Sequence, residues 1–408
     1  MKILLVTPYY DPDLGPSAPM FTTLSENLVA RGHAVTVLCA VPHFPSGIVP
    51  PEYRRDLWKW DEQNGVQICR ARVPSGDRAN LLHRTLVFIV YQLLVTLAGL
   101  RLQYDMALVT NPAIETGLPF VFLCWLRRKP CIYAVWDLYP EVGVRMGLFR
   151  NRIVIRLIRL LEDFCLHRAQ RIQILSDGFC ADLTHHSLAP GGITVIPHWL
   201  DTDLICPQPR KNPFSLEHSL DECFVVLYAG NLGLSQGLET VLESARQLAD
   251  RSDILFLFVG AGAGSSQLVE QAAGLRNVRF LPFQPRERLP EVLAAADISL
   301  VILKQGIGSV SLPSKLFSIL ASGRPVIASV DKNSDTWNLV GSSQAGLCVR
   351  PENPAALANA ILALKDDPLQ REQMGRNGRL WAEKYHSPQS AAGQFEQLFF
   401  SVMNGIKQ

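Results

Sequence analysis

The sequence has few features that would assign it to a class at once. Its nine cysteines include no CxxC pair. Several lie within predicted strands, so we interpret them as reduced core thiols in a reducing compartment; these are Cys39, Cys69, Cys131 and Cys348. The formal net charge of +2 indicates no particular partner, and we expect no nucleic acid. The N-terminal run MKILLVTPYY carries one lysine and stops at Asp11, which predicts a first strand and no signal peptide, and hence a cytoplasmic protein.

Charged residues are also scarce, at 19% of the chain against 48% hydrophobic residues. This balance suits large buried sheets and excludes a disordered or fibrous protein. With 408 residues the chain is too long for one ordinary domain. We therefore predict two α/β domains, an N-terminal one over 1–203, joined by 388–408, and a C-terminal one over 204–387.

The first half alternates short apolar runs with helical stretches, as in a parallel sheet covered on both faces. No GxGxxG motif follows the first predicted strand, so a standard dinucleotide clamp is not expected there. A linker rich in proline and polar residues follows Trp199, and the second half repeats the alternation. A last helix near 389–403 is too apolar for a free tail, and we expect it to pack back on the first domain. The predicted strands are 3–7, 34–39, 67–71, 106–110, 131–135, 171–175 and 193–196, then 224–228, 254–259, 278–280, 298–303, 325–329 and 346–349.

A nearly unbroken apolar run lies between Arg84 and Arg101. Its length of about sixteen residues falls short of the roughly 20 that a membrane-spanning helix needs. We therefore predict a buried crossover helix, with partial immersion in a membrane as the alternative.

The following region, from Arg145 to Arg171, interleaves arginines with aliphatic residues. Arg152, Arg156 and Arg159 recur at helical spacing on one face. A basic amphipathic helix of this kind is typical of contact with an anionic membrane surface. An ordinary solvated helix, or pairing with Glu162 and Asp163, remains the alternative.

Three glycine-containing loops of the second half each follow a predicted strand, at 229–237, 260–266 and 306–314. Loops after parallel strands lie on one edge of the sheet, and three together suit a nucleotide with a base, a ribose and phosphates. The third loop ends at Ser314, a candidate N-cap, and Lys315 follows inside the helix. Helix N–H groups with a lysine favour phosphate, although a routine strand-to-helix turn has the same form.

The matching edge of the first half carries Gly15 to Ser17, Asn111, and the segment WDLYPE from Trp136 to Glu141. Asp137 comes directly after an apolar strand, where a carboxylate is either a helix cap or a site group. His198 lies at the boundary between the halves, as a site residue or a cap of the hinge.

Taken together, the segments IPHWLD, AGNLGLSQGLE, FLPFQPRERLPEVLAAADISLV and PSKLFSILASGRPVIA resemble retaining nucleotide-sugar glycosyltransferases of the GT-B fold, over nearly the whole chain. The likeness is greatest to bacterial transferases of capsule, colanic acid and O-antigen synthesis. It implies two Rossmann-like domains facing a cleft, with the donor mainly on the second and the acceptor on the first. The resemblance implies a donor site formed by Gly15, Gly230, Asn231, Gly233, Gln236, Gly260, Phe283, Ser309, Ser311, Leu312, Ser314 and Ser318. It implies an acceptor cleft formed by Ser17, Asn111, Trp136, Glu141 and His198.

The chain departs from the family pattern at several positions. Arg and Lys, which many relatives use to hold the donor diphosphate, are replaced by Asn231 and Gln236. Two glutamates of the pattern are replaced by Val310 and Ser318, and a common histidine by Trp136. Lys315, the helix dipole and backbone N–H groups are left to meet the diphosphate charge. An apolar Val310 favours a deoxy or acetamido sugar.

The resemblance implies transfer of a hexosyl or acetamidosugar unit from a nucleoside diphosphate, expected to be UDP, with retention. Lys315 and Asp137 are the expected catalytic residues, and no metal or other cofactor is expected, because Asp201-Thr202-Asp203 lies in the hinge. The expected partners are the nucleotide-sugar, a lipid-linked or glycan acceptor, and the inner face of the plasma membrane through the region from Arg145 to Arg171. Two other classes stay open, a nucleotide-sugar epimerase of the same fold and a membrane-bound scaffold that has lost catalysis.

Overall fold

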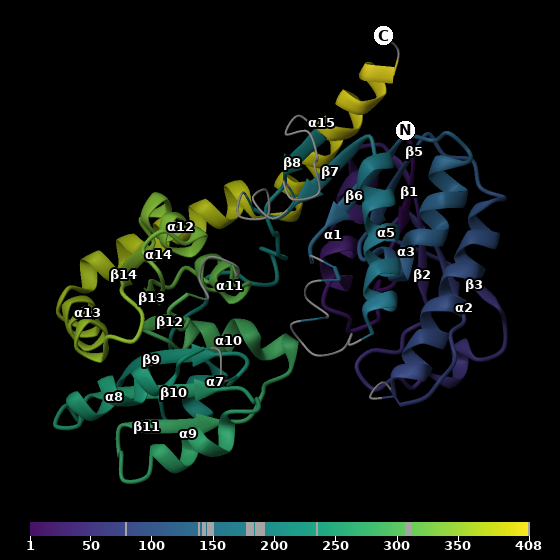
Figure 1. Ribbon diagram of the computed structural model, residues 1–408. Helices are drawn as coiled ribbons and strands as arrows, with labels where there is room; N and C mark the ends of the chain where they lie inside the picture. The colour runs from purple at the N-terminus through teal and green to yellow at the C-terminus, as the bar shows by residue number, and fades with distance from the viewer. Residues whose placement is uncertain are drawn as a thin grey trace. The chain divides into compact units, whose positions relative to one another are not determined.

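The computed structural model describes residues 1–77, 80–137, 139–140, 144, 151–176, 183, 192–233, 236–306 and 312–406. The chain divides into two compact units. Unit 1 comprises Met1–Pro197 with Pro388–Gln408, and unit 2 comprises His198–Ser387. Both are α/β units built on a mainly parallel sheet (Figure 1).

Unit 1 contains an eight-stranded sheet in the order β3-β4-β2-β1-β5-β6-β7-β8. All neighbours described are parallel except β3 and β4, which pair antiparallel at the edge. The sequence patterns predicted every strand but β3, whose half-exposed WKWDEQ segment is not an apolar run. The strands are β1 (Lys2–Val6), β2 (Ala34–Ala40), β3 (Trp58–Gln63), β4 (Val66–Ala71), β5 (Met106–Thr110), β6 (Cys131–Val135), β7 (Arg171–Ile174) and β8 (Ile193–Val195).

Three helical segments, α2, α3 with its continuation η2, and α5, pack beside one another and share a core with the sheet (Figure 1). Two of them start at asparagine caps. The Asn80 Oδ1 accepts a hydrogen bond from the Leu82 N–H at 2.9 Å, and the Asn151 Oδ1 accepts one from the Ile153 N–H at 2.8 Å. The helices of unit 1 are α1 (Ala18–Ala30), η1 (Pro51–Tyr53), α2 (Leu81–Gly99), α3 (Ala113–Pro119), η2 (Phe120–Trp125), α5 (Arg152–Arg168) and α15 (Pro388–Ile406).

The C-terminal helix α15 packs against α1, which confirms the prediction that the last helix returns to the first domain. Glu396 on α15 accepts hydrogen bonds from Arg31 and His33, both at 2.9 Å. The pKa of Glu396 is lowered, chiefly by its hydrogen bond with His33. Polar contacts at the edge of an apolar helix pair thus fix where α15 lies on α1.

Unit 2 contains six parallel strands in the order β11-β10-β9-β12-β13-β14. Both faces are buried, because alternate residues of β9 belong to two separate cores: Val225 and Leu227 on one face, Val226 and Tyr228 on the other. The strands are β9 (Phe224–Ala229), β10 (Ile254–Val259), β11 (Val278–Leu281), β12 (Ile298–Ile302), β13 (Val326–Ser329) and β14 (Gly346–Val349). The helices are α7 (Pro213–Glu217), α8 (Glu239–Gln247), α9 (Ser265–Gln271), η4 (Arg286–Arg288), α10 (Leu289–Ala294), α11 (Lys315–Ala321), α12 (Asp335–Ser343), α13 (Pro354–Asp366) and α14 (Pro368–Tyr385).

Helix α2 corrects one expectation. It is the crossover between β4 and β5, as predicted, but only one of its faces is buried, through Val87, Tyr91 and Val95. The other face is also apolar and is between 48% and 81% exposed, and its residues recur at helical spacing: Leu82, Leu86, Ile89, Leu93 and Leu97, here called the α2 apolar face. In the part of the chain that the structure describes, Leu82–Gly99 is the one helix long and apolar enough to cross a bilayer, a weak indication because core helices pass the same test.

Candidate active site

The strand orders locate the point in each sheet where a ligand crevice is expected. In unit 2 the order reverses between β9 and β12, and in unit 1 between β1 and β5. Ligands of open α/β sheets bind beyond the carboxyl ends of the strands at such points. The candidate site of unit 2 therefore lies at the loops after β9, β10 and β12, and that of unit 1 at the loops after β1, β5 and β6.

In unit 2 the loops after β9 and β10 are hydrogen-bonded to one another. Leu232 N–H donates to the Ala261 carbonyl at 3.0 Å, and Gly264 N–H donates to the Leu232 carbonyl at 2.8 Å. Gly260 has φ +150°, and a Cβ there would lie well inside 3.0 Å of the Gly230 carbonyl oxygen. Glycine is required at Gly260 both by the dihedral and by this close approach. The two loops form one hydrogen-bonded edge, here called the glycine edge, in which Gly230 and Gly260 leave their backbone without side-chain cover.

Lys315 lies against this edge. Its Nζ is 3.6 Å from the centre of the Tyr228 ring and would be 3.0 Å from a Cβ on Gly230. The Nζ is buried and has no hydrogen-bond partner among the described residues. Burial lowers the pKa of Lys315 to about 7. A buried amine that faces the backbone of Gly230, with no carboxylate partner among the described residues, is suited to an anion that arrives from solution.

The start of α11 differs from the sequence-based expectation. Ser314 is the N-cap residue, but its side chain makes no capping hydrogen bond and its backbone is already helical. The next N–H groups are used in a tight first turn, with Leu316 donating to Pro313 at 3.0 Å and Phe317 to Ser314 at 3.2 Å. The helix has seven residues. The positive character of this edge therefore comes mainly from Lys315 and less from the helix end.

The polar side chains of the first loop gather around a glycine. A Cβ on Gly233 would lie 2.6 Å from the Gln236 Oε1 and 2.8 Å from the Asn231 Nδ2. The Gln236 Oε1 is buried and has no partner among the described residues. Lys304, from the end of β12, approaches Gly237 so that its Cγ would be 2.9 Å from a Cβ there. Sequence reasoning missed Lys304, although its position directly after a strand was a usable signal.

His198 packs beneath α11, inside unit 2. Its ring stacks on Phe317 with centroids 5.1 Å apart, and Phe317 also contacts His386 at 4.4 Å. The His386 Nδ1 donates to the His198 carbonyl at 2.7 Å. Burial lowers the pKa of each histidine to about 4, so both rings are neutral near pH 7. The His198 Nδ1 is buried without a hydrogen-bond partner among the described residues.

The remaining donor-site predictions have mixed outcomes. Phe283 follows β11 and is 72% exposed, free to stack on a ligand. Leu312 packs on the unit 2 core, and Ser318 lies in α11, half-buried. Ser309, Val310 and Ser311 are outside the described residues. The donor-binding roles of all these residues stay predictions.

In unit 1 the loop after β1 is organised by a buried carboxylate that the sequence did not single out. The Asp13 carboxylate accepts hydrogen bonds from Gly15 N–H and His43 N–H, both at 2.7 Å. Burial alone would raise the pKa of Asp13, but hydrogen bonds from His43 and Gly15 outweigh burial and hold it below its usual value. A Cβ on Gly15 would collide with the Tyr9 ring. Ser17 caps α1 by position, without a side-chain hydrogen bond.

The loops after β5 and β6 are joined through one asparagine. The Asn111 Oδ1 accepts from the Trp136 N–H at 2.9 Å, and its Nδ2 donates to the Asp137 carbonyl. The Trp136 ring stacks on Phe21 at 4.4 Å and its Nε1 donates to the Gln173 Oε1 at 2.9 Å. Asp137 lies at the surface of this turn, where partial desolvation raises its pKa. Asn111, Trp136 and Asp137 are thus one assembly, while Glu141 lies outside the described residues.

A second buried carboxylate supports the same assembly. Glu162 on α5 is 2% exposed and accepts hydrogen bonds from Ala113 N–H at 2.8 Å and from the Tyr133 hydroxyl at 2.9 Å. Burial raises the pKa of Glu162 to about 7. This group holds the turn that follows Asn111. It also corrects the alternative in which Glu162 pairs with the arginines of α5 at the surface, because its carboxylate points into the core.

Metal ligation finds no support in the residues described. No group of three His, Cys, Asp or Glu side chains among them could hold a metal ion. Asp201 uses its Oδ1 to accept from Asp203 N–H at 3.0 Å and Leu204 N–H at 2.9 Å, which makes it the cap of a turn.

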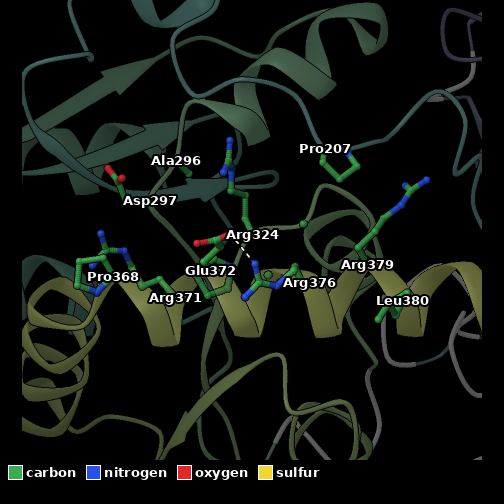
Figure 2. Close-up of a pocket in the computed structure, with 13 residues that line it drawn as sticks. Pro207, Ala296, Asp297, Arg324, Pro368, Arg371, Glu372, Arg376, Arg379 and Leu380 are labelled. Atoms are coloured by element: carbon green, nitrogen blue, oxygen red, sulfur yellow. Dashed lines mark hydrogen bonds and ion pairs between the residues drawn. The ribbon is translucent and has the colours of Figure 1, made fainter.

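Figure 2 shows a cavity of about 470 Å³ in unit 2, lined by arginines of α14 and by Arg324. It lies where β12 and β13 begin, at the edge of the sheet opposite to the glycine loops. Its arginines are used within the protein: Arg324 and Arg379 donate to backbone carbonyls, and Arg376 pairs with Glu372. We interpret this cavity as a gap in the packing between α14 and the sheet, with a structural role.

Comparison with known families agrees with this architecture. Residues 17–199 match the family described as glycosyl transferase 4-like domain, and residues 212–381 match glycosyl transferases group 1. The two matches follow the two units, and the chain is a glycosyltransferase of the GT-B fold, a member of these families. The resemblance to GT-B glycosyltransferases is confirmed, and retention and the donor remain predictions.

Among individual proteins, the chain is 28% identical over 394 residues to WcaI, the glycosyl transferase assigned to colanic acid biosynthesis in Escherichia coli K12, covering 92% of this chain and 96% of WcaI. Among solved structures it is similar to sucrose-phosphate synthase of Thermosynechococcus elongatus, with TM-score 0.70, 19% identity, and coverage of 99% and 100% of the two chains. It is also similar to HepE of Anabaena, solved with UDP, with TM-score 0.68, 16% identity, and coverage of 98% and 100%. At these identities the solved structures support the fold.

Proposed function

We propose that the protein transfers a sugar from a nucleoside-diphosphate sugar, with UDP as the carrier, to a hydroxyl of a lipid-linked or glycan acceptor, with retention, in the synthesis of a bacterial surface polysaccharide. The observation that carries the proposal is Lys315, whose buried and unpartnered Nζ faces the bare backbone of Gly230. The polysaccharide assignment is supported by the similarity to WcaI along nearly the full length of both chains, and the UDP assignment by the fold shared with HepE.

In this proposal the donor binds to unit 2. The diphosphate lies against the glycine edge, where Lys315 supplies a positive charge and the N–H groups of the loops donate hydrogen bonds. Asn231 and Gln236 face the same space and bind by hydrogen bonds in place of charge. The diphosphate raises the pKa of Lys315 from about 7, because an opposite charge replaces a desolvated environment. Phe283 is positioned to stack on the base.

The chemical step requires no nucleophilic side chain in this proposal. The departing diphosphate gains negative charge as the glycosidic bond breaks, and Lys315 stabilises that charge. The acceptor hydroxyl gives its proton to the leaving phosphate oxygen and forms the new bond on the same face of the sugar. The acceptor binds to unit 1, where Asp137, held by Asn111, orients a hydroxyl. No metal or other cofactor takes part.

We also propose that the protein works at the inner face of the plasma membrane. The α2 apolar face is unusual for a surface helix, since charged residues normally cover that side. In the same layer of helices α5 exposes Ile153, Leu157 and Leu160, which alternate with the exposed arginines Arg152, Arg156 and Arg159. Helices α2 and α5 are separated by α3, and apolar and basic side chains on one layer of helices suit an interface between acyl chains and anionic head groups.

A donor screen tests the proposal. The protein is incubated with UDP-linked hexoses and acetamidosugars and with lipid-linked acceptors, and glycosylated lipid is detected by mass spectrometry. We expect one donor to yield product with an unchanged anomeric configuration, without added metal and in the presence of a chelator. Lys315→Ala should lower the rate by orders of magnitude, and Asp137→Asn should lower it with UDP binding preserved. Donor consumed without acceptor and converted to an isomer would instead indicate an epimerase, and absence of nucleotide binding would indicate a scaffold.

A further inference from the structure

A basic cavity of about 670 Å³ lies in unit 1, between the end of η2 and the end of α5. Its lining includes Arg128, Lys129, His167 and Arg168, together with Trp125 and Leu126, and contains no carboxylate. Lys129 lies shortly before β6 and Gln170 just before β7. The cavity therefore opens at the amino edge of the sheet, away from the loops of the candidate active site.

The three permanent cations of this cavity are held without acidic partners. Arg128, Lys129 and Arg168 make no ion pair among the residues that the structure describes. Aromatic rings position two of them: the Arg168 guanidinium lies 5.8 Å from the Trp125 ring centre, and the Lys129 Nζ lies 5.7 Å from that of Tyr104. Cations gathered around one hollow without compensation favour an anionic ligand.

The rim of the cavity is partly apolar and lies near the C-terminal end of α2. Trp125 and Leu126 are 42% and 53% exposed, although both are large hydrophobic residues. Arg127 links the end of η2 to the end of α2, because its guanidinium donates hydrogen bonds to the Gly99 carbonyl at 3.1 Å and to the Leu102 carbonyl at 3.2 Å. The basic cavity thus lies beside the end of the helix that carries the α2 apolar face.

We propose that this cavity binds the phosphate of an anionic phospholipid, with its acyl chains along Trp125, Leu126 and the α2 apolar face. Arg128 and Arg168 bind phosphate oxygens through paired N–H groups, and Lys129 adds a point charge. A free phosphate would satisfy the cations but would leave the apolar rim exposed to water. The inference rests on the proposed membrane contact and adds a specific head-group site to it, separate from the acceptor site.

The test compares vesicles of phosphatidylcholine with and without phosphatidylglycerol in a sedimentation assay at low salt. The variant Arg128→Gln, Lys129→Gln, Arg168→Gln removes three charges from the cavity. Because each cation near an anionic surface contributes about fivefold to partitioning, we expect binding to phosphatidylglycerol vesicles to weaken roughly 100-fold. The matched control Arg276→Gln, Lys332→Gln, Arg350→Gln removes the same charge from exposed positions of unit 2, outside the proposed membrane contact, and we expect its loss to be under about threefold.

Equal losses in the two triple variants would overturn the cavity site, since a diffuse basic surface would then account for binding. Binding of glycerol phosphate as tight as that of short-chain phosphatidylglycerol would also overturn it, because the rim would contribute nothing. Failure of the wild-type protein to bind any anionic vesicle would overturn both this site and the membrane contact. Calorimetric binding of UDP, measured on the same samples, shows separately whether unit 2 is folded and whether the donor assignment holds.

Discussion

Replacing Lys315 by methionine should stabilise the empty protein while it weakens donor binding. In the folded protein burial lowers the pKa of this lysine from 10.5 to about 7, whereas the unfolded chain keeps the ordinary value. Folding therefore releases about half a proton at pH 7 and nearly a whole one at pH 8. A lowering of this size corresponds to at most about 5 kcal/mol, and loss of the contact with the Tyr228 ring offsets about 1–2 kcal/mol of it. Methionine keeps the length of the side chain and removes the charge, so the net gain is at most about 3–4 kcal/mol; we expect roughly 2 kcal/mol, because relaxation around the buried charge reduces its cost.

The sign of the pH dependence makes this prediction specific. Below pH 7 lysine is protonated in both states and the folded protein bears the whole cost of a buried charge. As pH rises from about 7 toward 10.5 the unfolded chain loses the proton too, and the cost disappears. The stability advantage of Lys315→Met should thus be largest at pH 7 and below and should close by about pH 10. Scanning calorimetry without ligand measures it, with an expected rise of about 4–8 °C in the unit 2 transition at pH 7.

Lys332→Met serves as the control, because Lys332 is exposed. We expect no change in its transition beyond about 1 °C. A Lys315→Met protein that is less stable than wild type at every pH would refute the reasoning, since the amine would then be stabilised by neighbours and not poised for an incoming anion. A stability gap that does not depend on pH would refute the assigned pKa.

Three further predictions concern the support of the site. Gly260→Ala should abolish UDP binding and destabilise unit 2 in calorimetry, because alanine does not fit the positive φ and its Cβ would collide with the Gly230 carbonyl. The control Gly341→Ala has open space around it in α12 and should be neutral or stabilising by about 1 kcal/mol. A Gly260→Ala protein with wild-type UDP affinity and stability would contradict the account of the glycine edge. Glu162→Gln should stabilise unit 1 above pH 7 and not below pH 4.5. Burial raises the Glu162 pKa to about 7, so ionisation of this carboxyl opposes folding above that pH. A difference in melting temperature between variant and wild type that stays the same at all these pH values would contradict it. Asn111→Ala removes the hydrogen bonds to Trp136 and Asp137, so it should lower unit 1 stability by about 2 kcal/mol in denaturant melts. It should also reduce sugar transfer without weakening UDP binding. A variant with full activity would show that Asn111 is not a positioning residue.

Much of the architecture could be predicted from the sequence because parallel strands buried on both faces are continuous apolar runs. The same reasoning missed β3, because an antiparallel edge strand with one solvated face carries charges such as Asp61 and Glu62. It also favoured a buried crossover helix for α2, with partial immersion in a membrane as the alternative. A helix that is apolar all round gives no periodic signal, so composition cannot tell which side is buried and which is the α2 apolar face.

The candidate site was predicted unevenly, for related reasons. Glycine spacing after strands indicated the edge that contains Gly230 and Gly260, because only glycine permits those dihedrals. The sequence also pointed to Lys315 but could not show that Tyr228 buries it, since that contact joins a strand to a distant helix. Asp13 and Glu162 were missed as supports for the same reason. Their importance comes from burial and from backbone N–H groups that the fold brings to them.

Calorimetric titration of UDP at pH 8, in buffers of different ionisation enthalpy, tests the central claim most directly. With a Lys315 pKa of about 7 only about a tenth of the free protein carries the proton at this pH. We predict that the wild-type protein binds UDP with uptake of nearly one proton, and that Lys315→Met binds at least tenfold more weakly with no proton uptake. Equal affinity of the two proteins, or binding without proton uptake by the wild type, would contradict the assignment of Lys315 and the glycine edge to the donor diphosphate.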